Sequence, residues 1–269
     1  MVGSDTGFTG SIPQIYDRYL GSVFFEPFAA DLAARLDHIT SGRVLEVAAG
    51  TGIATAAILA CLPEGVSLVA TDLNQAMLDY AKTKPELERV QWQQADGLAL
   101  PFEDEGFDAV ACQFGVMFFP DRVAGFREMH RVLKPGGLLV FNVWDRLAAN
   151  LLMQATVDGL ARRYPHHPSW FLERIPCGYR NPDEIRADLA KAGFTDCRIE
   201  IVRKTARVPG AREAAIGQCQ GTPMRAEIES LDPCGLETAT EAAANEIARH
   251  FGEGPFTVDM QALVVETRK

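Results

Sequence analysis

The sequence predicts an α/β fold in which helices cover both faces of a mostly parallel sheet. Two observations support this prediction. From residue 43 to residue 144, short apolar segments with strand character alternate with segments of helical periodicity, and strands that alternate with helices form parallel sheets. The first strand also ends in a glycine turn, Gly50-Thr51-Gly52, that leads directly into a helical segment, as in the strand–turn–helix units of doubly wound sheets.

A helical region at residues 13–38 precedes the alternation. Phe24, Phe25, Phe28, Leu32 and Leu36 recur there at helical spacing, so we expect them to pack on the core. Strands are then expected at 43–48, 66–71, 89–93, 107–112 and 138–144, and helices at 52–61, 74–83 and 121–133. The segment 134–137, Lys-Pro-Gly-Gly, should end the last of these helices, because proline and glycine interrupt helical structure.

The second half of the chain departs from this strict alternation. A helix is expected at 147–164, followed by a proline-rich loop over 165–176. Asn181 and Pro182 are typical of a helix N-cap and first helical residue, and Gly193 should end that helix. Two further strands are expected at 195–203 and 256–267, with a mostly helical region at 209–251 between them.

Composition narrows the class of protein. The 269 residues carry a formal net charge of −10, and 47% of them are hydrophobic, which fits a globular protein with a substantial core. The acidic balance disfavours nucleic acid and anionic membranes as partners. We find neither a run of the ~18 apolar residues that span a membrane nor a signal peptide. We therefore expect a cytoplasmic protein, and the sequence makes no prediction of its oligomeric state.

The glycine turn and a carboxylate after the second strand predict a nucleoside pocket at the carboxyl end of the sheet. Gly50 and Gly52 would let the backbone approach a ligand closely. Asp72 follows the second strand, where its carboxylate can accept hydrogen bonds from both ribose hydroxyls. The alternative role of Asp72 is a helix N-cap.

Two details favour S-adenosylmethionine over a nicotinamide dinucleotide. The third glycine of the dinucleotide turn is missing, because Ile53, Ala54 and Thr55 follow Gly52. Glu46 also lies in the strand just before the turn, where it would repel a pyrophosphate but tolerate a ligand with an ammonium and a sulfonium. Glu46 is either a partner of that ammonium or an anchor of the glycine turn.

Five segments occur in order at 45–52, 72–78, 95–102, 107–110 and 131–137. Together they resemble the class I S-adenosylmethionine-dependent methyltransferases, and among these the group of small-molecule enzymes that includes the ubiquinone/menaquinone type. The resemblance is close over the first half of the chain and holds in outline over the second. The family turn reads acid-x-Gly-x-Gly-x-Gly, and Ala48 here replaces the first glycine.

The resemblance implies a Rossmann-like sheet of seven strands whose last strand is antiparallel, with helical lid insertions. Residues 1–40 would be N-terminal helices over the cofactor site, and 41–145 the cofactor-binding core. Residues 181–208 and 254–269 would complete this core. Residues 146–180 and 209–253 would form the lid.

The resemblance also implies site residues. Asp96 and Gly97 would hold the adenine, and a solvated turn is the alternative for Asp96. Gln113 and Phe114 would lie where the chain passes beside the sulfonium. The alternative is that they simply belong to the core. Tyr16 lies on a helix that closes over the cofactor in similar enzymes, or is simply a half-buried tyrosine. The predicted cofactor-binding residues are Tyr16, Glu46, Ala48, Gly50, Thr51, Gly52, Asp72, Leu73, Met77, Asp96, Gly97, Gln113 and Phe114.

The predicted function is methyl transfer from S-adenosylmethionine to a small, partly apolar acceptor, which leaves S-adenosylhomocysteine. Because the leaving group is already cationic, alignment of the reactants can supply much of the acceleration, and the sequence assigns no catalytic residue. Tyr16, His166 and His167 are candidates for a general base, with an exposed loop as the alternative for the two histidines. The competing functions are an NAD-dependent oxidoreductase and a non-catalytic protein that binds adenosyl nucleosides.

The six cysteines are scattered without a CxxC pair, and zinc ligands usually occur in such pairs. No metal site is therefore expected, and buried free thiols are the simplest interpretation. The alternative, taken from arsenic-methylating enzymes that resemble this family, is a metalloid site formed by Cys177, Cys219 and Cys234.

Overall fold

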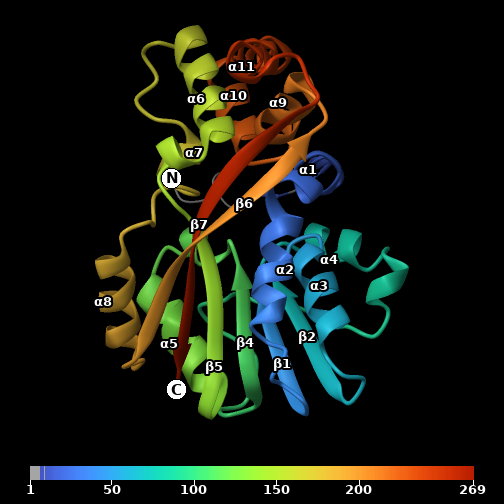
Figure 1. Cartoon of the computed structure of the whole chain (residues 1–269), viewed down its shortest axis with the longest axis vertical. Helices are drawn as coiled ribbons and strands as arrows, with labels where there is room; N and C mark the ends of the chain where they lie inside the picture. The colour runs from blue at the N-terminus through green and yellow to red at the C-terminus, as the bar shows by residue number, and fades with distance from the viewer. Residues whose placement is uncertain (1–6, 9) are drawn as a thin grey trace. The chain divides into compact units, whose positions relative to one another are not determined.

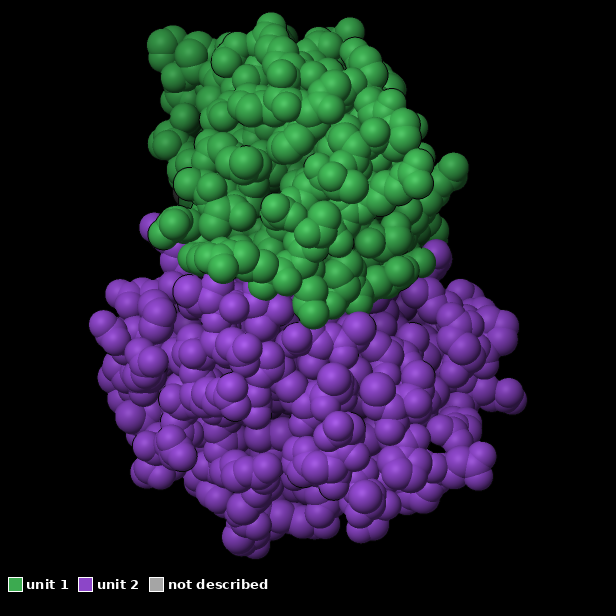
Figure 2. Space-filling view, viewed as in Figure 1, with its two compact units in different colours: residues 1–27, 145–178, 203–261 green, residues 28–144, 179–202, 262–269 purple. Residues whose placement is uncertain are grey.

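The structure is a computed structural model that describes residues 7–8 and 10–269. The chain forms two compact units, and each unit is assembled from three separate segments (Figure 2). Unit 1 consists of residues 1–27, 145–178 and 203–261, and unit 2 of residues 28–144, 179–202 and 262–269. The finer division into core and lid segments stays a prediction.

A seven-stranded sheet is the framework of the fold, with the strand order β3-β2-β1-β4-β5-β7-β6 (Figure 1). Strands β1 to β5 run parallel to one another, whereas β7 pairs antiparallel with β5. The predicted fold class is therefore confirmed, including the antiparallel last strand. The strands are β1 (Gly42–Val47), β2 (Val66–Asp72), β3 (Gln91–Gln94), β4 (Phe107–Gln113), β5 (Leu133–Trp144), β6 (Cys197–Val208) and β7 (Phe256–Arg268).

The order of the strands determines the face of the sheet on which each connecting helix of unit 2 lies. The connection from β1 to β2 steps one way along the sheet, and the connection from β4 to β5 steps the other way. Right-handed crossovers therefore place the two connecting helices on opposite faces. The helices of this unit are α2 (Glu26–Ala34, from Phe28 on), α3 (Ile53–Cys61), α4 (Gln75–Ala81), α5 (Arg122–Val132) and α8 (Pro182–Ala192), with short 3₁₀ turns η2 (Pro85–Leu87) and η3 (Val116–Phe118).

Unit 1 is mostly helical. Helix α11 packs against α6 and α9. Gly159 of α6 allows a close approach to α11, because a methyl group added there would lie 2.6 Å from the carbonyl oxygen of Ala242. No helix in the described part of the chain is long and apolar enough to cross a bilayer. The helices are α1 (Ile12–Leu20), the π-helix η1 (Gly21–Phe25), η4 (Leu147–Ala149), α6 (Leu151–Arg163), α7 (Phe171–Arg174), α9 (Ala211–Gln220), α10 (Met224–Leu231) and α11 (Leu236–Phe251).

The segment 134–137 follows the end of a helix, as predicted, but it already belongs to a strand. Helix α5 ends at Val132, and β5 begins at Leu133, earlier than the strand predicted at 138–144. Gly136 has a φ of +77°, and the register of β5 against β4 shifts between Phe107 and Ala109. The Pro-Gly-Gly sequence therefore forms a bulge within the strand.

The helix predicted at 147–164 is interrupted at Asn150. The side chain of Asn150 pairs with the backbone of Gln261 on β7, donating to its carbonyl oxygen at 3.1 Å and accepting from its amide nitrogen at 3.0 Å. Helix α6 begins only after this residue. Within the predicted proline-rich loop, α7 forms because Glu173 accepts a hydrogen bond from the backbone nitrogen of Trp170 at 2.8 Å.

Candidate active site

Asp72 connects the ends of β1 and β2. Its Oδ2 accepts a hydrogen bond from the backbone nitrogen of Gly50, and its Oδ1 accepts one from that of Asn74, both at 2.8 Å. Asn74 precedes α4 but makes no side-chain cap. Asp72 is 8% exposed, and burial raises its pKa. Since each carboxylate oxygen can accept more than one hydrogen bond, Asp72 both holds the turn and keeps acceptor capacity.

The two glycines of the turn share a backbone conformation but differ in the space around them. Gly50 and Gly52 have φ values of +57° and +83°, in the left-handed region that favours glycine. A methyl group added at Gly52 would lie 2.7 Å from Cδ1 of Leu87, whereas one added at Gly50 would meet nothing closer than Cε of Met77 at 3.7 Å. Side chains of the protein therefore occupy the space beside Gly52, and a contact between Gly52 and a ligand stays a prediction.

Two non-glycine residues adopt left-handed backbone at the carboxyl ends of β1 and β4. Ala48 has a φ of +59° and Phe114 a φ of +50°, a conformation that costs an L-residue about 1–2 kcal/mol. Gly115, the residue after Phe114, lies close to Ala48, because a methyl group added at Gly115 would lie 2.5 Å from Cβ of Ala48. Such strain concentrates at functional sites.

Asn142 of β5 supports the strained backbone at Phe114. Its Oδ1 accepts a hydrogen bond from the backbone nitrogen of Phe114 at 2.8 Å. The Phe114 ring stacks on Trp144 with a centroid distance of 4.0 Å, and Phe28 of α2 meets both rings edge-on. Gln113 and Phe114 therefore lie at the end of β4, and Phe114 belongs to the core of unit 2.

Glu46 is a fully buried acid at this edge of the sheet. Its side chain is 1% exposed. Burial raises the pKa of Glu46 to about 8, the neighbouring Thr55 opposes this rise, and the charge of Asp72 adds to it. Its Oε2 has no hydrogen-bond partner in the described structure, and neither has Oγ1 of Thr51. A buried polar atom without a partner is costly.

The loop after β3 carries the predicted adenine residues. Asp96 is exposed, and its Oδ1 accepts a hydrogen bond from the backbone nitrogen of Leu98 at 2.9 Å. Gly97 lies against the ring of Phe119, because an added methyl group would meet Cζ of that ring at 2.6 Å. Leu73, next to Asp72, is 49% exposed and offers an apolar surface.

The candidate general bases belong to unit 1, whereas all the other predicted site residues belong to unit 2. Tyr16 stacks on Phe25 with a centroid distance of 4.7 Å, and His166 is exposed. His167 stacks on Trp170 at 4.3 Å, and its Nε2 lies 3.4 Å from Oε1 of Glu227. Its Nδ1 has no partner among the described residues.

These features fit S-adenosylmethionine. A buried carboxyl with an unpartnered oxygen suits an ammonium group and would repel a pyrophosphate. Thr55, Asn142 and Phe119 support the site but were not predicted as site residues. The sequence could have indicated Asn142 as a site residue, since it is the one polar residue in the strand predicted at 138–144.

No group of three or more His, Cys, Asp or Glu side chains could hold a metal ion within residues 7–8 and 10–269. Cys177 lies beside Met153, with 4.0 Å between the two sulfur atoms. Burial raises the pKa of the Cys219 thiol to about 12, and Cys234 is exposed. The structure therefore gives no support to a three-cysteine metalloid site.

Comparison with known proteins identifies the class. Residues 45–141 match a family model described as a methyltransferase domain. The YcgJ protein of Bacillus subtilis has a similar structure, with a TM-score of 0.57 at 19% identity over 90% of this chain and 98% of that chain. A phosphoethanolamine N-methyltransferase 2 of Haemonchus contortus, solved with S-adenosylmethionine, gives a TM-score of 0.59 at 18% identity over 96% of this chain and 56% of that chain. The fold and the site define a class I S-adenosylmethionine-dependent methyltransferase.

Sequence relatives identify the family. A ubiquinone/menaquinone biosynthesis C-methyltransferase UbiE of Geotalea daltonii is 36% identical over 174 residues, which are 60% of this chain and 73% of the relative. A demethylmenaquinone methyltransferase of Deinococcus radiodurans is 42% identical over 168 residues, which are 56% of this chain and 67% of the relative. The chain belongs to this family of ubiquinone/menaquinone-type methyltransferases, whose cofactor is S-adenosylmethionine. The predicted class and cofactor are therefore confirmed.

The match is partial along the chain. Another UbiE methyltransferase, from Geotalea uraniireducens, is 37% identical over 110 residues, which are only 47% of that protein. The chain thus spans about half to three quarters of the length of these curated relatives.

Proposed function

We propose that this protein transfers a methyl group from S-adenosylmethionine to a ring carbon of a small, hydroquinone-like acceptor. The observation that carries the proposal is the 42% identity over 168 residues to a protein named as a demethylmenaquinone methyltransferase. That alignment is longer than the methyltransferase domain matched at residues 45–141, so the likeness extends beyond the cofactor-binding part.

The chemistry favours the reduced form of such an acceptor. When bound, S-adenosylmethionine supplies an electrophilic methyl group on a sulfonium sulfur. A quinone ring is electron-poor, whereas a hydroquinone ring, and more so its phenolate, carries electron density on the neighbouring ring carbons. The protein then has to align the acceptor, exclude water and accept the proton that the acceptor loses.

For the cofactor we assign three acids to three groups of the ligand. Glu46 pairs with the methionyl ammonium, since burial leaves its carboxyl without a compensating charge. Asp72 accepts from the ribose hydroxyls, and Asp96 accepts from the exocyclic amine of the adenine, with Leu73 against the purine face. The remaining predicted contacts, Tyr16, Ala48, Gly50, Thr51, Gly52, Met77, Gly97, Gln113 and Phe114, stay predictions.

For the general base we favour His167 over His166 and Tyr16. Glu227 lies within 3.4 Å of Nε2, which favours the tautomer whose Nδ1 can accept a proton. His167→Asn should lower kcat, whereas His166→Asn, a substitution of an exposed neighbour, should leave kcat unchanged. Equal behaviour of the two variants would exclude His167.

Two weaker features support a cytoplasmic enzyme that does not act on nucleic acid. The formal net charge is −10, which opposes binding to polyanions. The six cysteines are all free thiols, as is usual in reducing compartments. Fractionation of the native host and a nucleic-acid binding assay would test these two assignments.

Turnover with a defined acceptor tests the main proposal. The protein is incubated with ¹³C-methyl S-adenosylmethionine and demethylmenaquinone, with and without dithionite, and the product is read by NMR. We expect an aromatic carbon–methyl signal that requires the reductant. An oxygen–methyl signal would change the acceptor atom, and stabilisation of the protein by NAD but not by S-adenosylhomocysteine would refute the proposal.

A further inference from the structure

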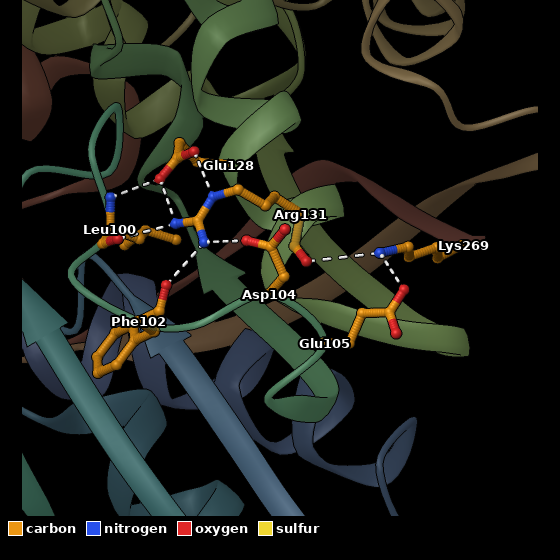
Figure 3. Close-up of polar contacts among 7 residues, drawn as sticks. All are labelled: Leu100, Phe102, Asp104, Glu105, Glu128, Arg131 and Lys269. Carbon is orange, nitrogen blue, oxygen red and sulfur yellow. Dashed lines mark hydrogen bonds and ion pairs between the residues drawn. The ribbon is translucent and has the colours of Figure 1, made fainter.

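Arg131, in the last turn of α5, uses all five of its side-chain N–H donors (Figure 3). Its Nε donates to Oε1 of Glu128 at 2.8 Å, and its Nη2 to Oε2 of the same residue at 2.7 Å and to the carbonyl oxygen of Leu100 at 2.9 Å. Its Nη1 donates to the carbonyl oxygen of Phe102 at 2.7 Å and to Oδ1 of Asp104 at 2.8 Å. We call these five residues the Arg131 cluster.

The Arg131 cluster holds the loop between β3 and β4 at several points. Leu100 is bound on both sides, because its backbone nitrogen also donates to Oε2 of Glu128 at 2.8 Å. The backbone nitrogen of Glu105 donates to the carbonyl oxygen of Arg131 itself at 3.0 Å. Lys269 lies 3.4 Å from both Glu105 and that same carbonyl oxygen. The loop over 100–105 is therefore bound to α5 along its whole length.

Asp96 is separated from the cluster by a single tight turn. The backbone nitrogen of Ala99 donates to the carbonyl oxygen of Asp96 at 3.0 Å, and that of Leu98 donates to its Oδ1 at 2.9 Å. The chain between Asp96 and Leu100 thus has little freedom to adjust. A displacement of Leu100 would be passed on to the carboxylate of Asp96.

We propose that Arg131 is a positioning residue for adenine recognition, which acts by fixing the loop that presents Asp96 to the exocyclic amine of the base. This inference rests on the proposed role of Asp96. It requires arginine rather than a general cation, because the donors of a guanidinium lie in a rigid planar fork, whereas a lysine has three donors on a single nitrogen. Lysine could keep an ion pair with Glu128 but could not bind both carbonyl oxygens and both acids.

Binding of two ligands that differ at one purine position tests the proposal without turnover. S-adenosylhomocysteine carries the exocyclic amine, and S-inosylhomocysteine carries a carbonyl oxygen there, which Asp96 would repel. Calorimetry should show that the wild type prefers the first ligand by about 10- to 100-fold, as expected for a hydrogen bond to a charged group. In Arg131→Lys the preference should fall to about threefold or less.

A matched variant separates this role from general stability. Arg127→Lys, one turn earlier on α5, changes an exposed arginine whose side chain donates to the carbonyl oxygen of Lys191, and it should keep the full preference. If Arg131→Lys weakens both ligands equally and leaves their ratio unchanged, Arg131 only stabilises the fold and the proposal is wrong.

Two further variants cover the remaining outcomes. If Arg131→Lys does not fold, Glu128→Gln perturbs the cluster from its other side and should lower the preference in the same way; an unchanged preference there overturns the proposal. Asp96→Asn reports on the underlying assignment. A wild type without any preference, or an Asp96→Asn variant that keeps it, would refute the role of Asp96 itself, which is distinct from a failure of Arg131 alone.

Discussion

Replacing Glu46 with glutamine should remove a pH dependence of cofactor binding. Burial raises the pKa of Glu46 from its ordinary value of 4.5 to about 8, so the carboxyl of the ligand-free protein is mostly protonated at pH 7. A ligand whose ammonium group pairs with the carboxylate requires the deprotonated form. The affinity for S-adenosylhomocysteine should therefore rise with pH and level off above about pH 8.

The size of this effect follows from the fraction of protein that is competent to bind. With a pKa of about 8, roughly one molecule in 100 is deprotonated at pH 6, so the apparent dissociation constant there should be about 100-fold above its limit at high pH. Glu46→Gln should show no such trend. Above pH 8 it should bind more weakly than the wild type, because a neutral amide replaces the charge.

The Glu46 carboxyl should make the folded protein less stable as the pH rises, whereas it makes ligand binding stronger. Because its pKa is higher in the folded than in the unfolded state, its contribution to stability is fully present below about pH 4.5 and is lost as the pH rises through 8. One pKa unit corresponds to about 1.4 kcal/mol, so the loss is on the order of several kcal/mol. The ligand-free Glu46→Gln variant should therefore be the more stable protein at pH 9 and should match the wild type near pH 4.5.

Titration calorimetry between pH 6 and 9, in buffers of different ionisation enthalpy, measures both the affinity and the proton released on binding. Denaturant unfolding at the same pH values gives the stability. Glu64→Gln, at an exposed position, is the control and should follow the wild type in both experiments. A pH trend that persists unchanged in Glu46→Gln would assign the titration to another group and refute the reasoning.

Three further substitutions test the geometry around the turn. Ala48→Gly should raise the free energy of unfolding by about 0.5–1 kcal/mol, because glycine tolerates the φ of +59°; Ala49→Gly, whose φ is not positive, should lower it in the same thermal melt. Asn142→Leu should cost about 0.5–1.5 kcal/mol, because it removes the side-chain acceptor at 2.8 Å from the buried backbone nitrogen of Phe114 and leaves only the carbonyl oxygen of residue 142 at 3.2 Å; unchanged unfolding would contradict the importance of the side-chain bond. Asp72→Asn should abolish the thermal shift given by S-adenosylhomocysteine, and a full shift in this variant would rule out its role in the site.

Much of unit 2 could be predicted because its signals are local. Asn181 does accept a cap hydrogen bond from the backbone nitrogen of Asp183 at 2.9 Å, and Gly193 ends α8 with a φ of +106°. The strands before and after the glycine turn were also placed correctly, since short apolar runs bounded by glycine and proline have few alternatives. Glu46 and Asp72 followed from their positions at the ends of two adjacent strands.

The features that the sequence did not predict have a different cause. Each depends on a partner residue that lies far away in the chain. Asn150 ends one helix and begins another because it binds Gln261, and nothing near Asn150 in the chain encodes that partner. The space beside Gly52 is filled by Leu87, so its sequence pattern could not separate a packing role from a ligand role. The sequence indicates Arg131 only as part of the family segment 131–137, because three of its five acceptors lie in a loop that precedes α5 in the chain.

The interleaving of the two units restricts how the protein can fold while it is being synthesised. Unit 1 requires residues 203–261, and unit 2 requires residues 262–269, in which β7 pairs with β5 from Trp144↔Ala262 to Leu138↔Arg268. Until these residues leave the ribosome, β5 is an open edge with a largely buried, apolar sequence. Unpaired apolar edges promote aggregation. Nascent chains of this protein should therefore depend on protection by chaperones until residues 262–269 have left the ribosome and paired with the edge of β5.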